Sequence, residues 1–112
     1  MKKLKYGTAL ELQTKNYKSV SYYCFKEKGE DNVTVLSNNK IKDISNSEGI
    51  EIIDNIKPLN IMKEVVLSSM SSRLIIVVGL DRMFESTYDR KKVTTYLEDY
   101  AKVADIKIII FR

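Results

Sequence analysis

The second half of the chain carries the clearest pattern of apolar and polar positions. A set of apolar residues recurs with the spacing i, i+3, i+4, i+7, i+8 and i+11, which is that of one face of an α-helix. These residues are Val93, Tyr96, Leu97, Tyr100, Ala101 and Ala104. Ser86 and Asp89 precede this run with the Ser-x-x-Asp spacing of a helix start, so we predict a helix that begins near Ser86. Residues 74–78 and 106–111 are short and apolar on both faces, which is typical of strands covered on both sides.

A strand, a helix and a strand in this order predict a parallel pair joined by a right-handed crossover. A further helix is predicted over residues 58–70, because the only proline, Pro58, suits a first helical turn. The apolar residues that follow at helical spacing, and that should pack on the sheet, are Leu59, Met62, Val66 and Met70, with Ile61 and Val65 on the same flank.

The first half of the chain has the features of strands joined by tight turns. Residues 4–12 alternate with a period of two, and residues 19–26 form a β-branched and aromatic run. Shorter strands are predicted at 33–36, 41–45 and 50–53, separated by clusters of Asn, Gly, Ser and acidic residues. We therefore predict one α+β domain over residues 1–112: an N-terminal antiparallel β-meander, then helix–strand–helix–strand, in a mixed sheet with two helices packed on it.

The composition is that of an ordinary soluble domain, with 44% hydrophobic and 30% charged residues in 112. Cys24 is the only cysteine, so no intramolecular disulfide can form, and its apolar surroundings predict a small buried side chain in a reducing compartment. The N-terminus lacks the apolar core of a signal peptide, and no apolar run approaches the length that crosses a bilayer. We expect a cytoplasmic protein with no membrane contact.

The residue types present exclude most catalytic chemistry. The chain has no histidine and neither of the glycine-rich phosphate-binding loops, so we expect no cofactor and assign no catalytic residue. Carboxylate chemistry remains as an alternative, because two or three carboxylates can hold Mg²⁺. The carboxylates that follow the strand at 74–78 are Asp81, Glu85 and Asp89.

Positive charge is concentrated near the N-terminus. Residues 1–28 hold seven lysines against two glutamates, a balance of +5, whereas the whole chain carries +4. This asymmetry favours an anionic partner, and single-stranded nucleic acids bind to aromatic rings interleaved with lysines. The candidate residues in this segment are Lys15, Lys18, Tyr23, Phe25, Lys26 and Lys28. In a strand Tyr23 and Phe25 would share one face, and ordinary cross-strand packing is the alternative.

Two further groups of residues lie around the start of the helix near Ser86. Arg90, Lys91 and Lys92 fall in its early turns, where cations oppose the helix dipole, so they either bind an anionic partner or form a solvated face. Met83 and Phe84 either cap the core beneath the loop or anchor a protein partner.

Three functions remain open, and the first is the leading hypothesis. It is a small non-enzymatic regulatory protein that binds nucleic acid; the Lys-, Ile- and Asn-rich composition suggests a phage or another mobile element. The second is a modulator or adaptor that binds a protein partner through a sheet edge or through residues 79–86, and the third is a Mg²⁺-dependent enzyme. A structure in which the N-terminal lysines and residues 90–92 share one face would support the nucleic-acid hypothesis. A structure in which they lie on different faces would support the protein-partner hypothesis. Open sheet edges also allow a homodimer.

Overall fold

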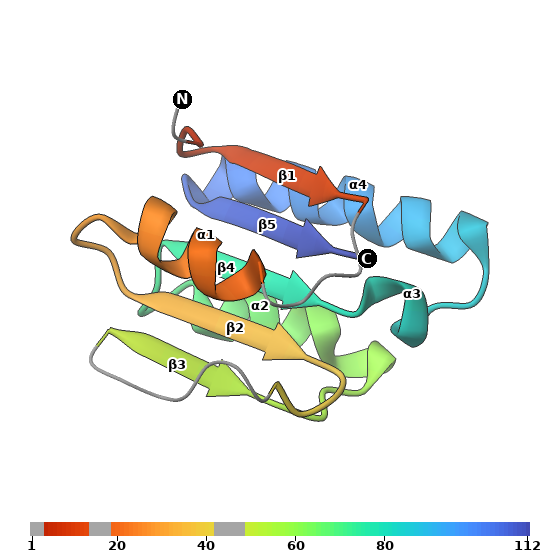
Figure 1. Cartoon of the computed structure of the whole chain (residues 1–112). Helices are drawn as coiled ribbons and strands as arrows, with labels where there is room; N and C mark the ends of the chain where they lie inside the picture. Colours follow the sequence, from red (N-terminus) through yellow and green to blue (C-terminus); the bar gives the residue numbers. More distant parts are fainter. Residues whose placement is uncertain (1–3, 14–18, 42–48) are drawn as a thin grey trace.

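A computed structural model describes residues 4–13, 19–41 and 49–112, and its centre is an all-parallel sheet (Figure 1). Five strands in these ranges lie in the order β1-β5-β4-β2-β3. Their bounds are Thr8–Leu12 for β1, Val33–Ser37 for β2, Ile50–Ile53 for β3, Leu74–Val78 for β4 and Lys107–Phe111 for β5.

Helices cover both faces of the sheet, which makes three layers. In Figure 1, α1 (Ser19–Lys28) lies in front of the sheet, and α2 (Ile61–Ser68) and α4 (Thr87–Ala104) lie behind it. The short 3₁₀ helix η1 (Pro58–Asn60) leads into α2, and α3 (Leu80–Met83) follows the end of β4. Two separate apolar cores, one on each face, account for the burial of all five residues in β2, β4 and β5.

The predicted antiparallel meander and mixed sheet are wrong, because all four strand pairs in the described part of the chain are parallel. The main error concerns residues 19–26, which were predicted as a strand and form most of α1. The helix buries Val20, Cys24 and Glu27, at positions i, i+4 and i+7. Aromatic and β-branched residues concealed this spacing, since their preference for strands is weaker than the packing of a helix on a sheet. The fold is therefore α/β.

The elements predicted in the second half are confirmed. Strands β4 and β5 are parallel neighbours in the sheet, and α4 is the crossover helix that connects them in the sequence. This helix starts where predicted, with the side-chain oxygen of Ser86 accepting a hydrogen bond from the backbone N–H of Asp89 at 3.4 Å. Of the strand expected at 41–45, Ile41 is buried outside any strand, and residues 42–45 lie outside the described residues.

The second predicted helix is present, but it turns a different face to the core. Ile61 is 2% exposed and packs under the sheet with Val65 and Ser68, whereas Leu59 is 98% and Met70 79% exposed. The 3₁₀ helix at residues 58–60 explains part of this difference, because its three residues per turn place Leu59 out of phase with the α-helix that follows.

A buried ion pair joins α1 to the start of β5. Lys107 Nζ lies 3.8 Å from Glu27 Oε2 and donates a hydrogen bond to the Glu27 carbonyl oxygen at 3.2 Å. The same carboxylate accepts the backbone N–H of Leu4 at 2.9 Å, and Lys26 approaches its other oxygen at 3.8 Å. The Lys107 ammonium also lies 4.6 Å from the centre of the Tyr6 ring. These contacts hold the C-terminal end of α1 against the amino-terminal edge of the sheet.

Candidate functional site

The carboxyl edge of the sheet has the geometry at which open α/β proteins bind ligands. Strand β1 is followed by α1 on one face, and β4 is followed by α3 and α4, with α4 on the other face. Strand β5 lies between these two strands, so it ends where the connections diverge. Ligands in parallel sheets bind beyond the carboxyl ends of strands at such a point.

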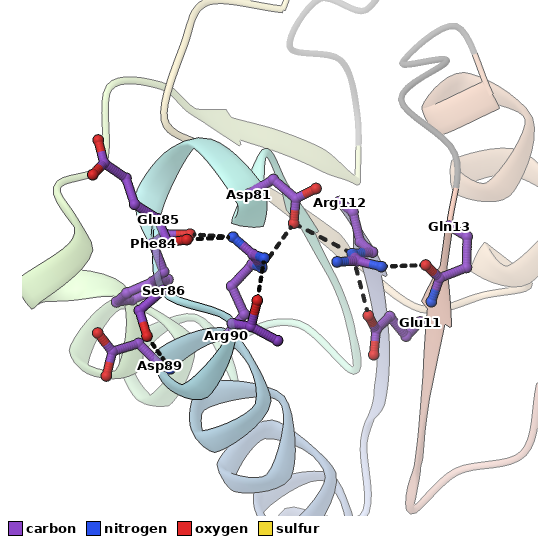
Figure 2. A network of polar contacts seen from close by, with 10 residues as sticks. Glu11, Gln13, Asp81, Phe84, Glu85, Ser86, Asp89, Arg90 and Arg112 are labelled. Carbon is purple, nitrogen blue, oxygen red and sulfur yellow. Dashed lines mark hydrogen bonds and ion pairs between the residues drawn. The ribbon is translucent and has the colours of Figure 1, made fainter.

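A network of charged side chains occupies this edge (Figure 2). Oδ1 of Asp81, in α3, lies 3.3 Å from the Nε atoms of both Arg90 and Arg112. Arg112 directly follows β5; its Nε lies 3.6 Å from Glu11 Oε1, and its Nη1 donates to the side-chain oxygen of Gln13. The network thus connects β1, β5, α3 and α4 through residues that are far apart in the sequence.

Arg90 has a structural role that explains its place near the start of α4. Its guanidinium donates to the carbonyl oxygens of Phe84 and Glu85, both at 2.9 Å, and to the Thr87 hydroxyl at 3.0 Å (Figure 2). These bonds hold the turn between α3 and α4, and the ion pair with Asp81 adds a charged partner. The unfavourable helix-dipole term of a cation here, about 0.3–1 kcal/mol, is offset by these contacts.

A polar cavity of about 390 Å³ lies beside this network, between α4 and β1. Charged, amide or hydroxyl groups occur on all of the side chains that line it. They are Glu11, Gln13, Thr87, Arg90, Lys91, Thr94, Thr95, Glu98 and Arg112. Its volume is within the range of small-molecule sites.

A second hollow, open and shallow, runs along the outer flank of α4. It has a volume of about 400 Å³ and is lined by Tyr88, Lys91, Lys92, Thr95 and Tyr96. Tyr88 is 73% exposed, and Lys92 Nζ lies 5.9 Å from the centre of the Tyr96 ring. Of the predicted cations 90–92, Lys91 and Lys92 are the exposed ones, and two tyrosines flank them.

The described N-terminal candidate residues and residues 90–92 do not lie on the same face of the sheet. Tyr23, Phe25, Lys26 and Lys28 lie in α1, on the face of the sheet opposite α4. Tyr23 packs its ring edge against Phe111 in the core, with ring centres 5.9 Å apart, while Phe25 is exposed. Lys15 and Lys18 lie outside the described residues.

Met83 and Phe84 lie at the core beneath α3. Met83 is 6% exposed and belongs to the core beneath α3, and the partly buried Phe84 packs against the same cluster. A buried methionine offers no surface to a partner protein.

The carboxylates of the Mg²⁺ alternative do not form a cluster. Among the described residues, no group of three or more acidic or cysteine side chains is placed so that it could hold a metal ion. Asp81 pairs with two arginines, and Glu85 and Asp89 are exposed.

Burial raises the pKa of the Cys24 thiol to about 11, so the sulfur stays protonated at neutral pH and is no nucleophile.

Several apolar side chains along residues 59–70 are exposed, although Leu59, Val66 and Met70 were predicted to pack on the sheet. Leu59, Val66, Leu67 and Met70, which we call the α2 outer face, are all exposed large apolar side chains. The signal that could have revealed it is the number of apolar residues at 59–70, which exceeds what one buried stripe requires.

None of the helices in the described ranges is long and apolar enough to span a membrane. The sequence matches no protein-family model and no curated protein.

Proposed function

We propose that this protein is a small non-enzymatic adaptor or modulator, acting in the cytoplasm, that binds a partner protein through the α2 outer face. One observation carries the proposal: four large apolar side chains are exposed along residues 59–70, and Leu59 is 98% exposed. Clustered exposed apolar side chains of this kind mark protein-interaction sites, since water contact costs free energy that a partner would recover.

The charges around this face indicate the chemistry of the partner. Lys63 lies in α2 between Leu59 and Val66 in the sequence, and Lys57 lies just before η1; both are exposed. A partner segment that presents apolar side chains beside acidic ones would match both the apolar contacts and these two cations. We therefore propose an amphipathic acidic segment of another protein as the partner.

The arrangement of the basic residues supports a protein partner over a single nucleic-acid surface. Lys26 and Lys28 lie on one face of the sheet and residues 90–92 on the other. No one flat partner can contact both groups at once. Such a distribution favours a protein partner over a nucleic acid that binds one continuous basic surface.

The test is photo-crosslinking in cells, with a crosslinking amino acid at position 70 and nuclease treatment of the lysate. We expect a discrete protein adduct that survives nuclease, and at least a ten-fold loss of it when Leu59→Glu is introduced. Leu59 and Met70 are exposed, so neither change should unfold the domain. Phe25→Glu, on the exposed side of α1, is the matched control and should leave the adduct unchanged. The proposal is wrong if the adduct disappears with nuclease or is unaffected by Leu59→Glu.

Binding of single-stranded nucleic acid is the second candidate, and the outer flank of α4 favours it. Tyr88 and Tyr96 are eight residues apart, about 12 Å along the helix, with Lys91 and Lys92 between them. Two exposed rings at this separation offer two stacking positions, and the lysines can neutralise phosphates.

Fluorescence anisotropy with labelled oligo-dT and oligo-U in 50 mM salt tests this second candidate. We expect Tyr88→Ala and Tyr96→Ala each to weaken binding about ten-fold, the loss of one base-stacking contact. Tyr22→Ala is the control, because Tyr22 is an exposed tyrosine of α1 on the opposite face. Undetectable binding, or equal binding by all three variants, would exclude a nucleic-acid site on α4.

A further inference from the structure

We propose that the polar cavity between α4 and β1 binds a small organic anion that carries hydroxyl groups, such as a sugar phosphate or a sugar acid. This proposal is independent of the α2 outer face; the cavity shares Lys91 and Thr95 with the hollow on the outer flank of α4. It is based on the position of the cavity, on the way its arginines are held, and on two charged side chains at its opposite ends.

The position of the cavity is that of a ligand site in a parallel sheet. It lies at the carboxyl ends of β1 and β5, where Gln13 and Arg112 leave the sheet, and its 390 Å³ would accommodate a ligand of sugar size. Three basic side chains line this space: Arg90 and Arg112, which belong to the ion-pair network, and Lys91, which does not.

Two of those basic side chains are held rigidly. Asp81 lies outside the cavity lining and pairs with the Nε atoms of Arg90 and Arg112, so it fixes both guanidinium groups from one side. Arg90 is further held by two carbonyl oxygens of the α3–α4 turn. Because these side chains are already ordered, a ligand that contacts them loses little side-chain entropy on binding.

The third basic side chain supplies charge that the network does not use. Within the described ranges Lys91 forms no ion pair, and neither does Glu98, which is seven residues further along α4. Seven residues are two helical turns, so the two residues lie about 10 Å apart along the axis of α4, and both line the cavity. The cavity therefore has a cationic end and an acceptor end.

The hydroxyl groups of Thr94 and Thr95 lie between these ends, and Thr94 is buried. A phosphate or carboxylate would pair with Lys91, while sugar hydroxyls would donate to Glu98 and exchange hydrogen bonds with the threonines. An anion without hydroxyl groups would leave Glu98 unpaired, and an uncharged polyol would leave Lys91 unpaired. This requirement for both groups is the specificity that the geometry predicts.

Isothermal titration calorimetry and thermal unfolding with four probes test the proposal: glucose 6-phosphate, gluconate, inorganic phosphate and sorbitol. We expect at least one of the first two to bind and to raise the melting temperature, at least ten-fold more tightly than inorganic phosphate or sorbitol. Which of the two binds distinguishes a phosphate ligand from a carboxylate ligand. Lys91→Ala and Glu98→Gln should each weaken that binding at least ten-fold.

The neighbouring residues provide matched controls. Lys92→Ala and Asp99→Asn change the same charge types one position away, at residues that do not line the cavity, and should bind as the wild type does. The proposal fails if neither sugar compound binds more tightly than about 10 mM. It also fails if inorganic phosphate binds equally well, or if Glu98→Gln has no effect. None of these outcomes bears on the α2 outer face.

Discussion

Replacing Lys107 by methionine is expected to lower the free energy of unfolding by about 3 kcal/mol, because it leaves the Glu27 carboxylate buried without its nearest interior cation. Methionine keeps most of the side-chain volume, so the loss of stability would come from the missing charge and not from a cavity. Lys26 still approaches Glu27 at 3.8 Å, and therefore we expect a value at the low end for a broken buried pair. Urea unfolding followed by circular dichroism measures the change.

Two variants control this experiment. Lys102→Met makes the same replacement at an exposed position of α4 and should change the stability by less than about 0.5 kcal/mol. The double variant Glu27→Leu with Lys107→Met removes both charges and should regain much of the lost stability, because no unpaired charge stays buried. A single Lys107→Met variant as stable as the wild type would show that the pair does not hold α1 on the sheet.

Ile61→Ala is expected to cost about 3 kcal/mol, whereas Leu59→Ala should change the stability by less than about 0.5 kcal/mol. The two residues are two positions apart and similar in size, but Ile61 is buried against the sheet and Leu59 projects from it. Urea unfolding gives both changes in the free energy of unfolding, from the shift of the midpoint when the dependence of that free energy on urea concentration (the m value) is unchanged. Equal losses, or a larger loss for Leu59, would mean that α2 packs in the orientation that the apolar spacing predicted.

The elements that the sequence predicted correctly are those whose apolar spacing has one interpretation. In α4 the apolar positions repeat over eleven residues and a capping serine marks the start, so both the type and the beginning of the helix follow from local chemistry. In β4 and β5 a continuous apolar run between polar residues is too short for a helix and fits a strand covered on both faces.

The elements predicted incorrectly are those in which several interpretations compete. Residues 19–28 bury only every third or fourth side chain, and aromatic residues occupy exposed positions of α1, so the strand-like composition outweighed the helical spacing. With α1 assigned as a strand, the first half contained no crossover helix, and only antiparallel pairing remained plausible. The misassignment of α1 therefore accounts for the missing crossover between β1 and β2.

The candidate site was only partly accessible from the sequence. Arg90 could be singled out because a cation near a helix start is unfavourable, but its partners could not be identified. Gln13 and Arg112 are 99 positions apart and meet only because β1 and β5 are neighbours in the sheet. The exposure of the α2 outer face likewise depends on which side of α2 meets the sheet.

The sequence by itself determined the position of five strands, two helices and the start of α4, and it excluded histidine-dependent chemistry. These features depend on neighbouring residues, whose spacing and type act over one or two turns. Tertiary structure decided the parallel strand order, the orientation of α2, and the meeting of Asp81, Arg90 and Arg112 at one edge. Those features depend on which elements cover which face of the sheet, and this is determined by burial summed over the whole chain rather than by any local pattern.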